Sequence, residues 1–133
     1  TPTAIKEVIN YAQNKYEKVN VILGAGGDRD KGKRMKMGEA SSIADYVIIT
    51  NDNPRNEDPL EISKNILEGI PLNKRSDVIL DRKEAIHKGV QLLKENEVLL
   101  VLGKGHEKYQ EIDNKFIPFD DVQITKEIME LEN

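Results

Sequence analysis

Glycine and charged residues concentrate in three short segments that each follow an apolar run: residues 24–34 (the first loop), 51–58 (the second loop) and 103–108 (the third loop). Glycine lets a backbone approach a ligand closely. Arg and Lys pair with carboxylates or phosphates, and an acid can pair with an ammonium group. Together these groups are the complement of an amino acid.

The first loop resembles two phosphate-binding motifs and completes neither. Gly27, Gly32 and Lys33 match most of a P-loop, but Arg34 stands where a Ser or Thr hydroxyl must bind magnesium. A dinucleotide fingerprint also fails, because Arg29 occupies a position that needs a small residue. On these residues alone, a solvated charged turn before a helix is as well supported as a binding loop.

The second loop contains Asp52-Asn53-Pro54-Arg55. Pro54 fixes its own φ and restricts Asn53 to an extended conformation, so the flanking side chains are expected to be held in place. An Arg beside a strand end can bind a carboxylate through two N–H donors, and Asn53 offers a donor and an acceptor. A capped turn that only begins the next helix is slightly favoured on this chemistry alone.

The third loop offers Gly103 and Gly105 for close backbone approach and Glu107 as a partner for an ammonium group. His106 is a weaker candidate for a base, since a lone loop His more often packs or donates a hydrogen bond. The sequence has no Ser-His-Asp arrangement and no His, Asp and Glu spacing typical of a protein-held metal.

The hydrophobic pattern predicts the scaffold that these loops need. Helical spacing is expected after the caps Thr1, Asp58 and Asp81 and near residues 34–44, and strands are expected at 19–23, 46–50, 78–80 and 97–102. This alternation predicts a Rossmann-like α/β fold with a mainly parallel sheet flanked by helices. A small antiparallel hairpin is expected over 108–117, before a last helix near 122–131. Ligands of such folds bind at the carboxyl ends of the strands, where the loops lie.

Composition sets the remaining bounds. The 133 residues fit one domain, and 38% hydrophobic with 33% charged residues is typical of a globular chain. The net charge of −4, from 24 acids and 20 bases, argues against a nucleic-acid partner. The absence of cysteine excludes disulfides and thiolate metal sites. No apolar run approaches the roughly 20 residues that span a membrane. Because Thr1-Pro2 opens directly on a helix cap, an excised domain is favoured over a small protein that lost its Met.

The three loops, in this order, resemble the Mur ligase family, and in particular its members that add the third peptide residue to UDP-N-acetylmuramoyl-L-alanyl-D-glutamate. The resemblance covers nearly the whole chain. It rests on residues 26–34, Ala44-Asp45, Asp52-Asn53-Pro54-Arg55, residues 103–107 with Tyr109-Gln110, and Phe119-Asp120-Asp121. It implies that residues 1–133 are the C-terminal, amino-acid-binding domain of a three-domain cytoplasmic enzyme of peptidoglycan synthesis, with the N-terminal and central ATPase domains upstream.

The resemblance also implies a reaction. ATP, bound with Mg²⁺ mainly by the central domain, phosphorylates the glutamyl carboxylate, and the amine of the incoming amino acid attacks the acyl phosphate to give an amide. The implied amino-acid contacts are Arg29, Asn53, Arg55, Gly103 and Glu107. Lys31, Lys33 and Arg34 are expected to face phosphate. No residue of this chain is expected to be catalytic, and the isolated domain is expected to be inactive.

Asp-Asn-Pro-Arg looks like the meso-diaminopimelate type of this family, whereas lysine-adding members lack the Arg. Diaminopimelate carries a second carboxylate that Arg55 would pair, and an unpaired carboxylate would be costly. Lanthionine shares that carboxylate and stays open as a substrate. The alternatives are a lysine-adding ligase, a non-catalytic Rossmann-like ligand-binding module, and a degenerate nucleotide-binding domain that Arg34 disfavours.

Overall fold

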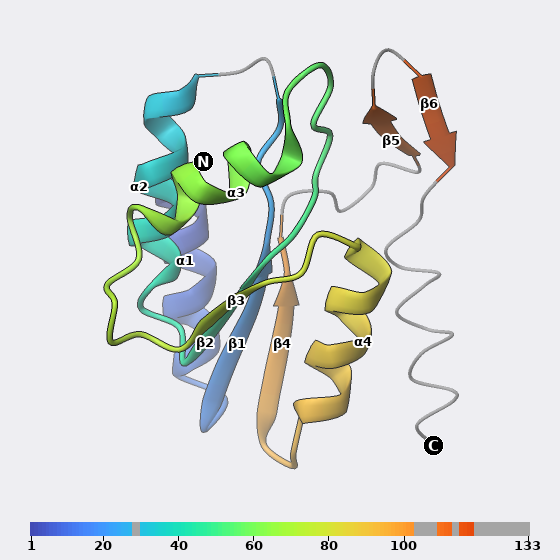
Figure 1. The fold of residues 1–133 in the computed structure, drawn as a ribbon. Coiled ribbons are helices and arrows are strands. Elements are labelled where there is room, and N and C mark those ends of the chain that lie inside the picture. Colours follow the sequence, from blue (N-terminus) through green and yellow to red (C-terminus); the bar gives the residue numbers. More distant parts are fainter. Residues whose placement is uncertain (28–29, 103–108, 113–114, 119–133) are drawn as a thin grey trace.

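The computed structural model describes residues 1–27, 30–102, 109–112 and 115–118. Strands and helices alternate along the chain, as expected from the sequence (Figure 1). In order they are α1 (Pro2–Gln13), β1 (Lys18–Leu23), α2 (Lys31–Ser41), β2 (Tyr46–Ile49), α3 (Pro59–Leu67), β3 (Ser76–Val78), α4 (Arg82–Leu92), β4 (Glu97–Val101), β5 (Tyr109–Ile112) and β6 (Lys115–Pro118). The last helix expected near residues 122–131 lies outside the described residues.

Four strands form one parallel sheet in the order β3-β2-β1-β4, and β5 pairs with β6 in a separate antiparallel hairpin. Both arrangements confirm the sequence prediction of a Rossmann-like α/β fold with an appended hairpin. Because β1, β2 and β4 run in the same direction, their carboxyl ends meet at one edge of the sheet. All three loops therefore begin at that edge.

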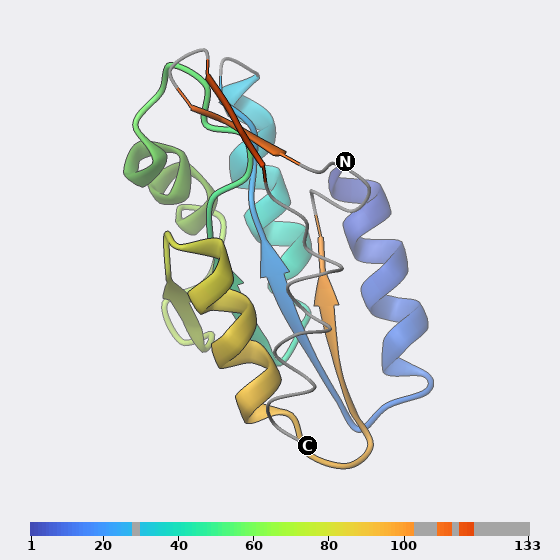
Figure 2. The same ribbon diagram turned by 90° about the vertical axis from the view of Figure 1, so that its right-hand side faces the viewer.

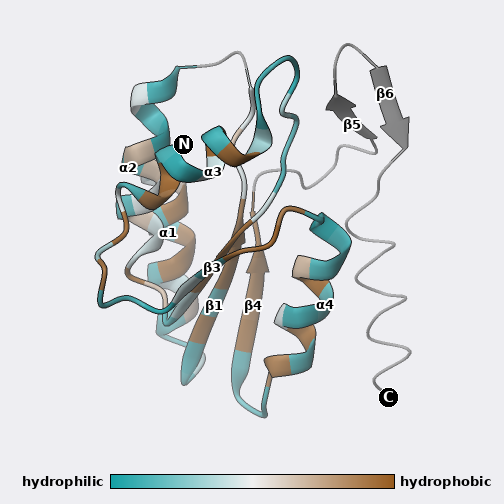
Figure 3. Ribbon diagram, viewed as in Figure 1, coloured by the Kyte–Doolittle hydropathy of each residue, from teal (hydrophilic) through white to brown (hydrophobic). Residues whose placement is uncertain are grey.

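Helices cover both faces of the sheet, with α1, α2 and α3 on one side and α4 on the other (Figures 1 and 2). Alternate residues of β1 face opposite sides: Val21 and Leu23 pack with α1 and α3, and Ile22 packs with α4. Hydrophobic residues accordingly make up most of β1 and β4, with the buried Asn20 as the one polar residue inside the apolar part of β1 (Figure 3). Such runs are typical of parallel strands that are covered on both faces.

Side-chain caps start the helices. Thr1, Asp58 and Asp81 cap α1, α3 and α4 as predicted, each accepting a backbone N–H of the first turn. The start of α2 differs from the prediction, because Asp30 accepts the Gly32 N–H at 2.9 Å and the helix begins at Lys31 rather than near residue 34. Lys33 and Arg34 are therefore helical residues and not part of an irregular loop.

Candidate functional site

The first and second loops are in backbone contact at the carboxyl edge of the sheet. The Gly27 N–H donates a hydrogen bond to the Asn53 carbonyl at 2.6 Å. A Cβ atom at position 27 would lie 1.7 Å from the Pro54 carbonyl oxygen, a distance that no side chain can tolerate. Glycine at position 27 is therefore what allows the two loops to touch.

Arg55 lies at this junction in an unusual backbone conformation. Its φ of 51° falls in the left-handed region, which residues other than glycine seldom adopt. Its Nη1 donates to the Gly27 carbonyl at 2.8 Å, so the side chain is bonded to the opposite loop. Backbone strain of this kind clusters at ligand sites, where surrounding contacts hold it in place. The contact fixes where the Arg55 guanidinium lies.

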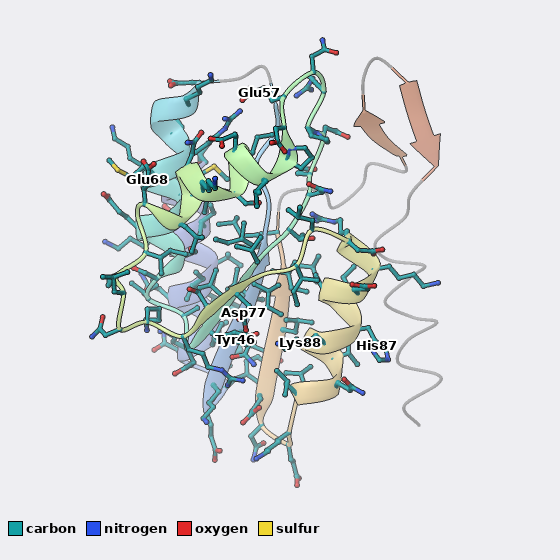
Figure 4. All side chains as sticks on the ribbon, viewed as in Figure 1. Tyr46, Glu57, Glu68, Asp77, His87 and Lys88 are labelled. Atoms are coloured by element: carbon teal, nitrogen blue, oxygen red, sulfur yellow. The ribbon has the colours of Figure 1, made fainter. Side chains whose placement is uncertain are left out.

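Arg34 is almost fully buried, with 1% of its side chain exposed. Its two terminal nitrogens donate to both carboxylate oxygens of Glu57, at 2.9 and 2.8 Å. Nη2 also donates to the Gly26 carbonyl at 2.9 Å, and Nη1 to the Asn65 side chain at 3.0 Å. Figure 4 shows Glu57 just before α3, at the loop edge of the sheet. These bonds join the first loop, the second loop and α3. Arg34 therefore has a structural role in addition to the phosphate contact that the sequence predicts.

Lys31 and Lys33, the other residues expected to face phosphate, are exposed in the first turn of α2. Lys33 and Arg34 line a cavity of about 360 Å³ together with residues of the first loop and the N-terminus of α1. The Arg34 Nε is buried and has no hydrogen-bond acceptor among the described residues. Lys31 is not among the residues that line this cavity.

Arg29, Gly103 and Glu107, the remaining predicted amino-acid contacts, lie outside the described residues, as does His106. The point at which the third loop begins is described. The Leu102 N–H donates to the Ile22 carbonyl at 2.9 Å, which places the end of β4 beside the end of β1. The third loop thus starts at the same edge as the other two.

Two contributors to this edge were missed in the sequence analysis, Glu57 and Arg82. Arg82 is 2% exposed, and its Nη1 donates to the Asn51 carbonyl at 2.7 Å. The helical spacing could have indicated that Arg82 is buried, because it lies on the same helix face as Ala85, Ile86 and Gly89, which are all buried. No local pattern distinguishes Glu57 from the other acids of the second loop.

The described part of the chain holds no group of three or more His, Asp or Glu side chains arranged to bind a metal ion. Within the same residues, no helix combines the length and hydrophobicity needed to cross a membrane.

Comparison with known proteins identifies the family of this chain. Residues 1–105 match the family model described as "Mur ligase, glutamate ligase domain". A UDP-N-acetylmuramoyl-L-alanyl-D-glutamate–2,6-diaminopimelate ligase of Rickettsia felis is 44% identical over 98% of this chain and 25% of its own length. The ligase of the same name from Aquifex aeolicus is 42% identical over 97% of the chain and 27% of its own length.

A solved structure of a UDP-N-acetylmuramoyl-L-alanyl-D-glutamate–2,6-diaminopimelate ligase superimposes with a TM-score of 0.94 at 36% identity, covering 99% of this chain and 28% of that one. The chain spans about a quarter of the length of the relatives that it matches. Its α/β scaffold, its contacting loops at the carboxyl edge and these similarities lead to one conclusion. The chain belongs to the Mur ligase family, whose glutamate ligase domain it carries.

Proposed function

We propose that this chain is the C-terminal, amino-acid-binding domain of an ATP-dependent ligase that adds meso-diaminopimelate to UDP-N-acetylmuramoyl-L-alanyl-D-glutamate, a cytoplasmic step of peptidoglycan synthesis. The names of its relatives support the reaction. The chain spans about a quarter of their length, which leaves room for the further domains to which this proposal assigns binding of the nucleotide sugar, ATP and Mg²⁺. The reaction is proposed for the complete ligase, and residues 1–133 are proposed to supply its amino-acid site.

The observation that carries the proposal is the anchored Arg55 at the junction of two loops. A guanidinium fixed in position beside strand ends is suited to bind a carboxylate in a bidentate manner. In this proposal Arg55 pairs the second carboxylate of diaminopimelate, and Gly103 with Glu107 receives the ammonium group at the same end. Asn53 and Arg29 complete the amino-acid contacts.

The chemistry asked of these residues is positioning. The glutamyl carboxylate is activated as an acyl phosphate, and the amine of diaminopimelate attacks its carbonyl carbon. The tetrahedral intermediate then expels phosphate and leaves an amide. Holding the amine beside the acyl phosphate replaces an encounter in solution, and good alignment of two reactants is worth about 7–11 kcal/mol at most.

Phosphate is proposed to lie near the start of α2. Lys33 and Arg34 border the cavity of about 360 Å³ beside the first loop, and Lys31 adds a third positive charge in the same turn. Both terminal nitrogens of Arg34 bond to protein oxygens and its Nε is buried, so Arg34 would act on phosphate by its charge and by holding the first loop in place. Lys33 is exposed and is the more direct candidate.

Replacing Arg55 tests the proposal in a complete ligase that carries this chain. We expect Arg55→Ala to weaken use of meso-diaminopimelate by about 2–4 kcal/mol, the scale for losing one partner of a charge-paired contact. Use of L-lysine, which lacks the second carboxylate, should change little. Initial rates over a range of each amino acid, at fixed ATP and UDP-muramoyl dipeptide, measure both effects.

Arg75→Ala is the matched control, because Arg75 is an exposed arginine that stacks on the Tyr46 ring, 4.1 Å from its centroid, away from the loops. It should leave both amino acids unaffected. An equal loss for lysine in Arg55→Ala would mean that Arg55 binds the α-carboxylate or only supports the loop. A wild-type enzyme that prefers lysine would identify the lysine-adding type, and one that prefers lanthionine would change the substrate within the same site.

A further inference from the structure

Two arginines are buried at the carboxyl edge of the sheet and come from opposite faces of it. Arg34 belongs to α2 and is 1% exposed, whereas Arg82 belongs to α4 and is 2% exposed. Burying a guanidinium is costly unless its N–H groups find acceptors. The positions of those acceptors therefore indicate what each arginine does in the molecule.

The acceptors of Arg34 link the first loop to the second. Its Nη2 donates to the Gly26 carbonyl, and both terminal nitrogens donate to Glu57. Gly26 precedes Gly27, whose carbonyl accepts from Arg55. Glu57 follows Arg55 by two residues. Arg34 therefore bonds to the chain on both sides of the contact that fixes the Arg55 guanidinium.

The acceptors of Arg82 link the second loop to the residue that precedes the third. Nη1 donates to the Asn51 carbonyl at 2.7 Å, and Nη2 donates to the Leu102 carbonyl at 3.4 Å. Asn51 follows β2 and Leu102 follows β4, and these two strands are separated by β1 in the sheet. No sheet hydrogen bond can join strands that are not neighbours, so Arg82 bridges two ends that the sheet itself leaves unlinked.

We propose that Arg34 and Arg82 are positioning residues, Arg34 setting the spacing of the first and second loops and Arg82 the spacing of the second loop and the end of β4, where the third loop begins. The consequence for binding rests on the proposed function: a diamino acid that contacts Arg55 and Glu107 together depends on the distance between their loops. Fold stability alone would not require the Arg34–Glu57 pair, because a buried ion pair can often be replaced as a whole by apolar residues of similar volume without loss.

Amide hydrogen exchange of the 133-residue chain, measured by NMR, tests the spacing role without any ligand. In Arg34→Met, exchange of the Gly27 amide should accelerate about tenfold or more relative to the Asp45 amide, the scale of one lost charge-assisted hydrogen bond. Asp45 is the reference because its N–H bonds to Val19 at the opposite edge of the sheet. In Arg82→Met, the Leu102 amide should show the same selective acceleration.

Arg34→Lys and Arg82→Lys keep the test decisive if a Met variant does not fold. Lysine retains the positive charge but cannot donate to several acceptors at once as the planar guanidinium does. They should give smaller accelerations at the same amides. Arg75→Met, a matched change outside the loops, should leave Gly27 and Leu102 unchanged. Equal acceleration of all three amides, or none, would overturn the proposal, because a role in general stability acts on the whole molecule.

A double-mutant cycle in the complete ligase connects the spacing to binding. Once Arg55→Ala has removed the guanidinium, Arg34→Lys should reduce the meso-diaminopimelate kcat/KM by a smaller factor than it does in wild type. Selective exchange in a ligase that does not use diaminopimelate would support the positioning role and reject the proposed function. Use of diaminopimelate with uniform exchange, or with additive effects in the cycle, would reject the positioning role alone.

Discussion

The Tyr46 hydroxyl donates a hydrogen bond to Asp77 Oδ2, and Lys88 Nζ lies 3.4 Å from the same oxygen. These residues lie toward the end of the sheet opposite the loops (Figure 4). Burial, and then the contact with Asp77, raises the pKa of Tyr46. The Tyr46 hydroxyl, helped by the charge of Lys88, lowers the pKa of Asp77. The pair therefore joins β2 to β3 in a way that depends on the ionisation of Asp77.

Tyr46→Phe should lower the free energy of unfolding at neutral pH by about 1 kcal/mol, a modest value for a bond to a charge because 48% of the Asp77 side chain is exposed. A carboxyl whose pKa is lower in the folded chain stabilises the fold above its unfolded value of 3.8. That stabilisation is lost as the pH falls through the folded pKa. The difference between variant and wild type should thus shrink below pH 3.8, as measured by urea unfolding at several pH values.

Tyr11→Phe is the control for this change, because Tyr11 is 61% exposed on α1 and its ring rather than its hydroxyl contacts Lys15. Its effect should stay within about 0.5 kcal/mol at every pH. A Tyr46→Phe effect that does not vary with pH would assign the hydroxyl a role in packing instead.

At the residue scale, the sequence predicted the caps better than the buried arginines. Thr1, Asp58 and Asp81 accept hydrogen bonds from N–H groups two or three residues away, so the local sequence is enough to predict these caps. Arg34 and Arg82 can be buried because their N–H groups donate to oxygens that lie 8 to 31 residues away in the sequence. No local sequence pattern indicates such distant acceptors. The helical phase of Arg82 was visible in the sequence, whereas α2 has little apolar periodicity that could indicate the burial of Arg34.

At the element scale, α2 and α3 approach each other backbone to backbone. A Cβ at Gly38 would lie 2.0 Å from the Ile66 carbonyl oxygen, and one at Gly69 would lie 1.9 Å from the Met35 carbonyl oxygen. The sequence carries no signal for this contact, because α2 shows little apolar periodicity and buries only Arg34, Gly38 and Ser41. The close approach also brings Arg34 within 3.0 Å of Asn65.

Gly38→Ala should therefore destabilise the chain by about 1–3 kcal/mol, because two helix backbones must separate to admit one methyl group. Gly32→Ala is the matched control in the same helix, where a Cβ would meet only Asp30 Oδ1 at 3.3 Å. Its effect should stay within about 1 kcal/mol of wild type, since alanine favours the helix. Thermal unfolding followed by far-ultraviolet circular dichroism suits a chain without Trp. Equal stability of the two variants would contradict the backbone contact between α2 and α3.

At the scale of the whole molecule, the alternation of apolar runs was enough to predict a parallel sheet with loops at one edge. The strand order β3-β2-β1-β4 was beyond such reasoning, because β4 pairs with β1 after two intervening strands. The contact between the first two loops was equally beyond it, since it depends on Gly27 meeting Pro54 across the ends of β1 and β2. The sequence thus predicted where the site lies more fully than how its parts are joined.

These 133 residues alone should fold but should not form an amide bond. Buried clusters on both faces of the sheet give the chain a core of its own, so it should unfold in a single cooperative transition in urea. It should nevertheless form no amide from UDP-N-acetylmuramoyl-L-alanyl-D-glutamate, meso-diaminopimelate and ATP with Mg²⁺. Its one near-match to a P-loop has Arg34 in place of the hydroxyl that binds magnesium, and that Arg is bonded to Glu57.

Mass spectrometry of the reaction mixture measures the product directly, with a complete ligase as the positive control. The folded chain should yield none, because an amino-acid site can align an amine only after the acyl phosphate exists. Product formed by the chain itself would place the ATP chemistry within these residues and contradict the proposed division between domains. A chain that fails to unfold cooperatively would instead indicate that its core depends on contacts with the proposed upstream domains.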